Sequence, residues 1–375
     1  MGGHAPVTAA STPLAGLTTM RVGGPAARLV TTTSREEIIS AVQAADEAGE
    51  PVLLLSGGSN LVVADAGFEG TVVRIASRGI QVSAAGEYIQ LRVAAGHRWD
   101  DLVAEAVASG WSGIEALSGI PGATGATPMQ NVGAYGQDVS QTITQVHTWD
   151  RLLRRPQVFQ ASACRFGYRT SRFKQEQLPG RSGEPGPRGP RHVVLEVVFQ
   201  LAVGVESAPI GYADLARQVG AALGDRVPLA LAREGVLAQR RARGMVLDDA
   251  DHDTWSCGSF FTNPTLGEQE FTAMAARVRR RCGPDAAPPR FAAEGGLAKT
   301  SAAWLIERAG FAKGYGLPGP VALSTKHTLA VTNRGGATCK DVLALAAQVR
   351  DGVLDAFGVR LVNEPVLVGC ALPEP

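Results

Sequence analysis

The 375-residue sequence has no run of 18 or more apolar residues, which excludes a helix long enough to span a bilayer. Its charges nearly cancel, because 36 Lys and Arg residues oppose 35 Asp and Glu residues and leave a net charge of +1. A protein with this balance has no general electrostatic attraction to nucleic acid or to a membrane surface. The start of the chain lacks a basic stretch followed by an apolar core, so we expect a cytoplasmic protein that is not secreted.

Cysteine and histidine are also few and scattered. The five cysteines are odd in number and no two have C-x-x-C spacing, which argues against a disulfide framework and against a zinc site. The six histidines are equally dispersed. The segment DADHD around His252 could offer metal ligands, but we prefer to interpret it as a solvated acidic loop. We therefore expect no bound metal and a reducing compartment.

Two familiar phosphate-binding patterns are missing or misplaced. No G-x-x-x-x-G-K-[ST] segment occurs, which excludes a P-loop. The segment GYGLPG (314–319) matches G-x-G-x-x-G literally, but it follows a helical pattern rather than a strand. Pro318 and Pro320 also prevent a helix from beginning there, so the segment does not predict a Rossmann nucleotide site.

The sequence does contain the alternation of a mixed α/β protein. Its length indicates two or three domains, and a hydrophobic content of 45% is enough to bury substantial cores. Apolar residues at helical spacing predict helices over 34–49, 99–110, 232–246, 265–281 and 340–358. Apolar runs and alternation predict strands over 51–55, 61–63, 70–75, 88–96, 192–202 and 359–369. We expect the Gly- and Pro-rich stretch 179–190 to be a surface excursion.

The stretch TWSCGSFFTNP (254–264) contains a serine that local structure does not explain. Asn263 and Pro264 are a good N-cap and first residue for the helix predicted to end at 281. That interpretation gives no reason for Ser259 or for Gly258 before it. The stretch alone leaves turn chemistry and a reactive hydroxyl as open alternatives.

Two glycine-rich loops could hold a ligand. The amides of SGGSN (56–60), which follows a buried strand, could form a nest for a diphosphate, although an ordinary turn is the simpler explanation. The segment LSGIPGATGATPMQNVGAYGQ (117–137) is far longer than a typical connection of about four to six residues, and such loops are usually functional. Together the two loops suggest a dinucleotide cofactor held without a Rossmann motif.

Five motifs, in order, make the sequence resemble a known family. They are SGGSNLVVAD, IPGATGATPMQNVGAYG, CRFGYRTSRFK, GSFFTNP and LVNEPVLVG. As an ordered set they resemble the UDP-N-acetylenolpyruvoylglucosamine reductase (MurB) family. The similarity extends from about residue 18 to Gly369, nearly the whole chain.

The resemblance implies a fold and a function. The α/β fold would be of the vanillyl-alcohol-oxidase type, with two lobes that bind FAD, plus a C-terminal α/β domain that binds substrate. The first lobe would span 1–83, completed by 359–375, the second lobe 84–245 and the substrate domain 246–358. The activity would be the NADPH-dependent reduction of UDP-N-acetylglucosamine enolpyruvate to UDP-N-acetylmuramate through non-covalent FAD, a cytoplasmic step of peptidoglycan synthesis. Nothing in the sequence suggests an interface, so we expect a monomer.

The resemblance also assigns binding residues. The FAD diphosphate would contact Gly57, Gly58, Ser59 and Asn60. The rest of the cofactor would contact Pro121, Gly122, Thr124, Gln130, Asn131, Gly133 and Tyr135. Substrate contacts would come from Tyr168, Tyr212, Asn263 and Lys299.

Three catalytic residues carry over by motif position: Arg169, Ser259 and Glu364. The planar, permanently charged guanidinium of Arg169 suits the substrate carboxylate. Ser259 would donate the proton that a substrate carbon receives after hydride addition. Glu364, kept from helical conformation by Pro365, would assist that protonation. Without the resemblance, Arg169 would be interpreted as a surface residue and Glu364 as a solvated one.

The sequence departs from the family pattern at two positions. The family carries a lysine shortly before the serine motif, whereas this chain has arginines there, and Arg243 is the expected substitute. Cys257 stands where a smaller residue is usual, and we expect it to show some sensitivity to thiol reagents.

Two other functions stay open. A flavin oxidase of the same wider fold is disfavoured because neither glycine loop contains a histidine that could bind flavin covalently. A silent module that binds flavin or a nucleotide sugar is disfavoured because such a module needs no proton donor. The sequence does not distinguish NADPH from NADH as the reductant.

Overall fold

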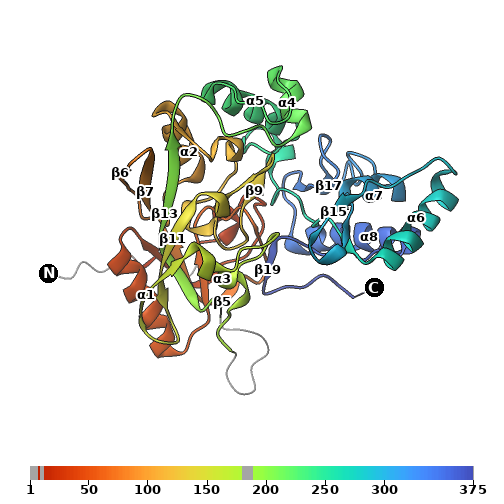
Figure 1. Ribbon diagram of the computed structural model, residues 1–375. Coiled ribbons are helices and arrows are strands. Elements are labelled where there is room, and N and C mark those ends of the chain that lie inside the picture. Colours follow the sequence, from red (N-terminus) through yellow and green to blue (C-terminus); the bar gives the residue numbers. More distant parts are fainter. Residues whose placement is uncertain (1–6, 9–11, 180–188, 375) are drawn as a thin grey trace. The chain divides into compact units, whose positions relative to one another are not determined.

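The computed structural model describes residues 7–8, 12–179 and 189–374 (Figure 1). The chain divides into two compact units. Unit 1 consists of Met1–Thr12, Ala26–Gly57 and Phe68–Arg241, and unit 2 of Pro13–Pro25, Gly58–Gly67 and Ala242–Pro375. Most of the predicted excursion at 179–190 lies outside the described residues. The division into two lobes and a substrate domain stays a prediction.

The first sheet of unit 1 has the order β1-β2-β5-β3, with β2, β5 and β3 parallel. Its strands are β1 (Val7–Thr8), β2 (Ala26–Thr32), β3 (Val52–Leu55) and β5 (Phe68–Ile75). Helix α1 (Arg35–Ala48) packs against β2, β3 and β5. The Ser34 side chain accepts from the amide of Glu37, and Gly49 ends the helix with a φ of 71°. This helix and the strands β3 and β5 confirm the sequence prediction.

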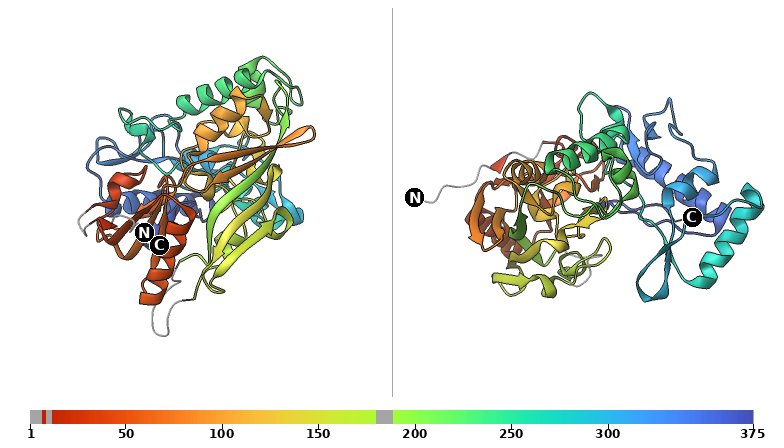
Figure 2. Two further views of the ribbon diagram at one scale, coloured as in Figure 1. Left: turned by 90° about the vertical axis from the view of Figure 1, so that its left-hand side faces the viewer. Right: turned by 45° about the horizontal axis from the view of Figure 1, so that its top comes forward.

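The second sheet of unit 1 is antiparallel, with the order β12-β11-β13-β7-β6 and β8 added to β13. Its strands are β6 (Ile80–Ala85), β7 (Tyr88–Ala94), β8 (Trp111–Ser112), β11 (Ile143–Asp150), β12 (Arg155–Gln160) and β13 (His192–Val203). Helix α2 (Trp99–Ala108) buries Trp99, whose ring centroid lies 5.8 Å from that of Phe199. A satellite cluster joins α4 (Ala213–Val219) to α5 (Leu229–Ala242), the green helices of Figure 2.

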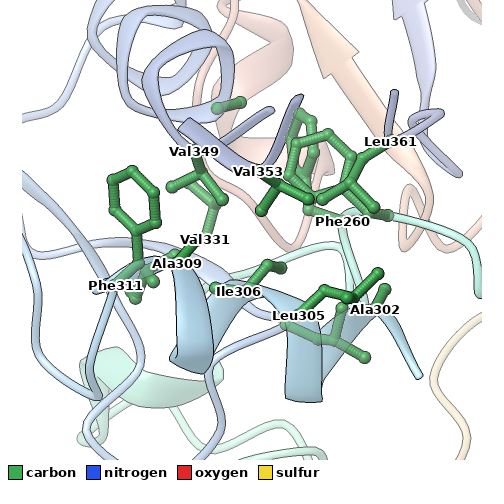
Figure 3. Packing of buried hydrophobic residues seen from close by; sticks show 14 of the residues in the cluster. Phe260, Ala302, Leu305, Ile306, Ala309, Phe311, Val331, Val349, Val353 and Leu361 are labelled. Atoms are coloured by element: carbon green, nitrogen blue, oxygen red, sulfur yellow. The ribbon is translucent and has the colours of Figure 1, made fainter. Parts of the chain in front are cut away.

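Unit 2 is built around three helices, α6 (Glu268–Cys282), α7 (Ala302–Ala309) and α8 (Cys339–Phe357). Figure 3 shows their core, in which Phe260 and Leu361 gather with side chains of α7 and α8. The short strands are β4 (Leu61–Val63), β14 (Thr265–Leu266), β15 (Phe291–Ala292), β16 (Ala298–Lys299), β17 (Val321–Leu323), β18 (Val331–Asn333) and β19 (Val366–Val368). Strand β19 pairs in parallel with β4, so the end of the chain is joined to the segment after SGGSN.

Three element predictions are wrong in their bounds. The helix predicted over 265–281 begins at Glu268, where the carboxylate of Glu270 accepts from the amide of Gly267 at 2.8 Å, while Thr265–Leu266 pairs with β16. The helix predicted over 232–246 begins earlier and ends at Ala242, and Gly244 follows with a φ of 67°. The strand predicted over 359–369 is reduced to β19, because the preceding residues adopt an irregular path.

The structure also bears on the segment GYGLPG (314–319) and on the length of the helices. GYGLPG forms turns after α7 and before β17, which confirms that it is no Rossmann motif. Within the described ranges, no helix combines the length and apolarity that a bilayer crossing requires.

Candidate functional site

The two glycine-rich loops meet backbone to backbone in unit 1. A Cβ atom added to Gly57 would lie 2.5 Å from the Cα atom of Gly122, a distance that real Cβ atoms do not tolerate. No side chain therefore separates the loops at this point. Gly57 is also exposed, so its backbone is accessible to a ligand. A phosphate group can approach a backbone closely only where no side chain is in the way.

The SGGSN loop continues into unit 2, where it contacts the segment that carries Glu364. Gly58 adopts a φ of 58°, and a Cβ atom there would lie 2.0 Å from the carbonyl oxygen of Leu17. Ser59 follows in the turn, and the Asn60 amide nitrogen donates to the carbonyl oxygen of Glu364 at 3.3 Å. The amide of Val366 donates back to the carbonyl oxygen of Asn60 at 3.0 Å. A predicted diphosphate residue and a predicted catalytic residue are thus neighbours.

The second loop, 117–137, is held at its beginning by side chains of helices and turns. Asp100 accepts from the amide of Gly119 at 2.6 Å and from both terminal nitrogens of Arg233. Thr124, fully buried, donates its hydroxyl to the carbonyl oxygen of His97 at 3.1 Å. Pro121 and Gly122 lie between these two anchors. The loop is therefore an ordered structure rather than a slack connection.

The end of the same loop is bonded to the motif that carries Arg169. The Asn131 amide nitrogen donates to the carbonyl oxygen of Gly167 at 3.3 Å, and its oxygen accepts from the amide of Ser140 at 3.1 Å. Arg169 donates through Nη2 to the carbonyl oxygen of Gly133 at 3.0 Å. Ser171 donates to the carbonyl oxygen of Met129 at 2.6 Å, next to Gln130. The structure thus brings predicted cofactor residues and a predicted catalytic residue together.

Backbone strain gathers in this region. Asn131, Tyr135 and Arg169 have positive φ angles of 46°, 51° and 53°, values that non-glycine residues adopt at a cost. Such strained residues occur preferentially at functional sites, where the surrounding bonds hold them. The guanidinium of Arg169 also lies over the ring of Tyr168, 5.6 Å from its centroid.

A charged network fixes the segment after Arg169. Glu176 contacts Arg165, Arg172, Arg191 and His192, and the last of these lies 2.8 Å away through Nε2. Burial alone would raise the pKa of Glu176, but the bond from His192 and the nearby arginines outweigh it and lower the pKa. Asp150, fully buried, behaves in the same way: burial opposes ionisation, and bonds from Arg191 and the amide of Leu153 hold its pKa below the usual value.

Tyr212 lies beside the second loop. Its ring meets that of Tyr135 edge to face, with centroids 5.6 Å apart. Glu115, almost completely buried, holds both segments because it accepts from the side chain of Gln137 at 3.0 Å and from the amide of Ala208 at 2.6 Å. A predicted cofactor residue and a predicted substrate residue are therefore in contact.

Ser259 stands on a tight turn in unit 2. The amide of Gly258 donates to the Ser256 hydroxyl at 3.1 Å, and Gly258 has a φ of 73° with open space around its Cβ position. Phe260 and Phe261 after it are buried in the core of unit 2 and anchor the turn. Figure 3 shows Phe260 among the side chains of this core. The amide of Glu364 donates to the carbonyl oxygen of Phe260 at 2.9 Å. Ser259 and Glu364 therefore belong to adjoining backbone segments.

Asn263 and Lys299 belong to segments that adjoin just before α7, where the amide of Thr300 donates to the carbonyl oxygen of Pro264 at 2.9 Å. The side-chain oxygen of Asn263 accepts from the amide of Ala302 at 3.0 Å, so it bonds to the first amide of α7, whose N-cap is Ser301, and does not cap the helix predicted over 265–281. Lys299 pairs with Thr265 in the small sheet. Arg243, the expected substitute for the family lysine, acts together with Lys313 on His327, where burial first and these charges second lower the pKa to about 4.

One sequence expectation is wrong at this site, and another holds only in part. Cys257 is buried and donates to the carbonyl oxygen of Leu61 at 3.2 Å, and burial raises the pKa of its thiol to about 12. A thiol in this state does not react readily with thiol reagents. The DADHD segment is solvated only in part: Asp249 and Ala250 are exposed, whereas Asp253 is buried and bonded to Arg334 at 2.7 Å. The ring of His252 lies tilted against that of Trp255, with centroids 4.2 Å apart.

The predicted site residues divide between the two units. Unit 1 holds Gly57, Pro121, Gly122, Thr124, Gln130, Asn131, Gly133, Tyr135, Tyr168, Arg169 and Tyr212. Unit 2 holds Gly58, Ser59, Asn60, Ser259, Asn263, Lys299 and Glu364. Among the residues described, no cluster of three or more His, Cys, Asp or Glu side chains could hold a metal ion. Sequence reasoning missed Asp100, Glu115 and Asp150, whose partners lie far along the chain.

Comparison with family models matches residues 26–153 to the FAD binding domain. Residues 249–368 match the C-terminal domain of UDP-N-acetylenolpyruvoylglucosamine reductase. The reductase of that name from Thermobifida fusca is 53% identical over 365 residues, 97% of this chain and 99% of the relative. The one from Streptomyces avermitilis is 55% identical over 362 residues, 96% of this chain and 94% of the relative.

A solved structure gives the same result for the fold. The crystal structure of UDP-N-acetylenolpyruvylglucosamine reductase from Thermus caldophilus has a TM-score of 0.64 and 24% sequence identity, with 97% of this chain and 100% of that chain covered. With the FAD binding domain, it confirms the predicted fold class, the FAD-binding α/β fold with a C-terminal α/β domain. The chain therefore belongs to the UDP-N-acetylenolpyruvoylglucosamine reductase family and is an FAD-dependent oxidoreductase.

Proposed function

We propose that the protein reduces UDP-N-acetylglucosamine enolpyruvate to UDP-N-acetylmuramate with NADPH, as a cytoplasmic step of peptidoglycan precursor synthesis. Family membership over nearly the whole chain supports the reaction. The observation that carries the proposal is the bond from the amide of Glu364 to the carbonyl oxygen of Phe260, which joins the segments of both proton-handling residues. We also propose that the enzyme is a monomer built of two FAD-binding lobes and a substrate domain.

The chain's residues fit non-covalent FAD. Gly57 and Gly122 meet without side chains between them, and Gly58 leaves no room for a Cβ atom. Gly57, Gly58, Ser59 and Asn60 would hold the diphosphate, while the second loop would line the remainder through the residues from Pro121 to Tyr135. Bound FAD would supply the redox chemistry, a hydride accepted from NADPH and passed to the terminal methylene of the enolpyruvyl group.

The reacting carbon next to the carboxylate must then receive a proton. Arg169 would bind the carboxylate, because a guanidinium can make two parallel bonds to it and stays charged. Ser259 would donate the proton, and Glu364 would assist from the adjoining segment. The buried phenylalanines after Ser259 keep the turn in place and keep water from its core side.

The remaining substrate contacts would surround these groups. Tyr168 lies next to Arg169 in the chain and beneath its guanidinium. Tyr212 would cover the substrate beside Tyr135, while Asn263 and Lys299 would bind the nucleotide end. Lys299 is the cation proposed for the UDP diphosphate, with Arg243 in place of the family lysine.

The test is identification of the product. Purified protein is incubated with FAD, NADPH and the enolpyruvyl sugar, and the mixture is analysed by mass spectrometry. We expect a product two hydrogen masses heavier than the substrate, formed in equal amount to the NADPH consumed. NADPH consumption that depends on oxygen and leaves the sugar unchanged would identify an oxidase-like reaction instead.

A further inference from the structure

A buried turn near the start of unit 2 contacts two segments of the proposed site. One is the SGGSN loop (56–60), here called the diphosphate loop, and the other is the turn Ser256–Ser259, here called the serine turn. It is the segment TTMR (18–21), in which Thr18, Thr19 and Met20 are buried. The amide of Thr19 donates to the carbonyl oxygen of Gly58 at 3.1 Å. The hydroxyl of Thr19 donates to the carbonyl oxygen of Ser256 at 2.6 Å, in a buried bond. One residue thus joins the two loops through two separate donors.

The conformation of this turn is fixed by its surroundings. Arg21 has a positive φ of 56°, and its amide donates to the carbonyl oxygen of Thr18 at 3.3 Å. The Asn333 side chain donates to the carbonyl oxygens of Met20 at 3.1 Å and Arg21 at 3.2 Å. The guanidinium of Arg21 lies 3.9 Å from the ring centroid of Trp255. A turn held in this way gives Thr19 a defined position against both loops.

The serine turn needs such support on its open side. Gly258 has a left-handed φ of 73°, which glycine adopts more easily than any other residue. A Cβ atom added there would have no other atom within 4 Å. The hydroxyl of Thr19 bonds this turn to the TTMR segment at Ser256, and the thiol of Cys257 bonds it to the carbonyl oxygen of Leu61, the residue after SGGSN, at 3.2 Å. Both bonds lie within three residues of Ser259 along the chain.

We propose that Thr19 is a positioning residue for proton transfer, whose hydroxyl holds the Ser256–Ser259 turn against the diphosphate loop so that Ser259 delivers its proton along a fixed path. The inference rests on the proposed function and deepens it, since it adds a residue with no assigned role. Thr19 acts through Ser256 and touches no reacting group. Misplacement of a catalytic group by about 1 Å can cost on the order of 100-fold in rate, so loss of this bond should be visible in the protonation step.

The test compares three variants by anaerobic stopped-flow absorbance of the flavin. Thr19→Val removes the hydroxyl but keeps the branched shape and the amide that bonds to Gly58, whereas Thr19→Ser keeps the hydroxyl. Thr18→Val is the matched control, because Thr18 is equally buried and its hydroxyl, among the residues that the structure describes, bonds only to nearby carbonyl oxygens, those of Ala15 and Val22 at 3.4 Å. Flavin content and the melting temperature are measured for each protein.

We expect all three variants to retain FAD and to be reduced by NADPH within about threefold of the wild-type rate, because the amide of Thr19 stays in place. Reoxidation by the enolpyruvyl sugar should slow about 10- to 100-fold in Thr19→Val alone, by the geometric argument above. Equal slowing of both half-reactions in Thr19→Val, or the same slowing in Thr18→Val or in Thr19→Ser, would overturn the positioning role.

Two further results separate the possible failures. A wild-type protein that is never reoxidised by the enolpyruvyl sugar overturns the proposed function itself, before any variant is compared. Should Thr19→Val not fold, Thr19→Ala removes the same hydroxyl while keeping the amide, and is expected to show the same selective loss. An unchanged reoxidation rate in Thr19→Ala would then overturn the proposal.

Discussion

The amide of Glu364 donates to the carbonyl oxygen of Phe260 at 2.9 Å, so the backbone around the proposed proton donor Ser259 is bonded to that around Glu364. The pairing continues as an isolated bridge between Phe261 and Asn363. Two segments more than 100 positions apart in the chain are thus held in one register. The proposed roles, in which Ser259 donates the proton and Glu364 assists, depend on this register.

Ser259→Ala should separate the two half-reactions. Flavin reduction by NADPH should continue near the wild-type rate, because it needs no proton from Ser259. Reoxidation by the enolpyruvyl sugar should slow by about 10²- to 10⁴-fold, the usual contribution of a general acid. Rapid mixing of pre-reduced protein with substrate measures this step, with Ser83→Ala on the exposed strand β6 as the control. Equal loss of both steps would exclude Ser259 as the proton donor.

Gly57→Ala should cost both FAD binding and stability. The added methyl group would lie 2.5 Å from the backbone of Gly122, so the two loops must separate. Overpacking of this kind costs about 1–3 kcal/mol. Gly204→Ala is the matched control in the same unit, since nothing lies within 4 Å of its Cβ position. Flavin fluorescence titration and thermal unfolding measure the effects, and wild-type FAD affinity in Gly57→Ala would contradict the proposed diphosphate site.

Tyr212→Ala should raise the KM for the enolpyruvyl sugar while Tyr212→Phe should change it little. The ring of Tyr212 meets that of Tyr135 edge to face at 5.6 Å, and phenylalanine retains this contact. Loss of an aromatic pair is worth about 0.5–1.5 kcal/mol, or roughly 2- to 10-fold in KM. The KM for NADPH should stay unchanged in both variants. Steady-state assays in which each substrate is varied in turn measure these KM values. Equal KM values for the enolpyruvyl sugar in Tyr212→Ala and Tyr212→Phe would show that the ring of Tyr212 does not contribute to substrate binding.

Asp150 should make the protein lose stability in acid. Its pKa is lowered in the folded state, since the bonds from Arg191 and Leu153 outweigh the opposing effect of burial. Its contribution to the free energy of unfolding is therefore fully present above the unfolded carboxyl pKa of about 3.9 and is lost as the pH falls through the folded pKa. Urea unfolding at a series of pH values below about 5 should show a shallower slope for Asp150→Asn than for wild type. The exposed control Asp355→Asn should retain the wild-type slope, and a wild-type slope in Asp150→Asn would contradict this account.

Cys257 should resist thiol reagents in the folded protein. Burial raises the pKa of its thiol to about 12, so the reactive thiolate is scarce at neutral pH. Labelling with a maleimide followed by peptide mass analysis should modify the partly exposed Cys282 first and Cys257 only after denaturation. Labelling of Cys257 in the native protein at a rate similar to Cys282 would show that the serine turn opens.

Local sequence signals predicted the elements that carry their own caps and apolar runs. Helix α1 has Ser34 before it and Gly49 after it, while β3 is a continuous apolar segment and β13 a mostly apolar one. Strand β11 was not predicted, because it buries Thr148 and Asp150 next to apolar residues and so breaks the alternation that marks a strand. The start of α6 was misplaced because Asn263 resembles an N-cap, whereas its side chain accepts from the first amide of α7, that of Ala302, 39 positions along the chain.

The site was predicted only in part for a similar reason. Composition and glycine spacing pointed to two ligand loops, while the roles of Arg169, Ser259 and Glu364 came from the family resemblance. Nothing in the sequence connects Thr19 to Ser256, since the bond joins residues 237 positions apart. Glu115 is likewise identified only by the segments it joins in space. Positioning residues become visible only once the fold places their partners.

The most direct test of the proposed function is anaerobic stopped-flow absorbance near 450 nm, where oxidised flavin absorbs. The purified holoprotein is first reduced with NADPH and then mixed with UDP-N-acetylglucosamine enolpyruvate or with buffer alone. The proposed function predicts that the yellow colour bleaches with NADPH and returns only with the enolpyruvyl sugar. A protein that binds FAD and bleaches but is not reoxidised by that sugar would contradict the proposed function, although it would still belong to the family by fold and sequence.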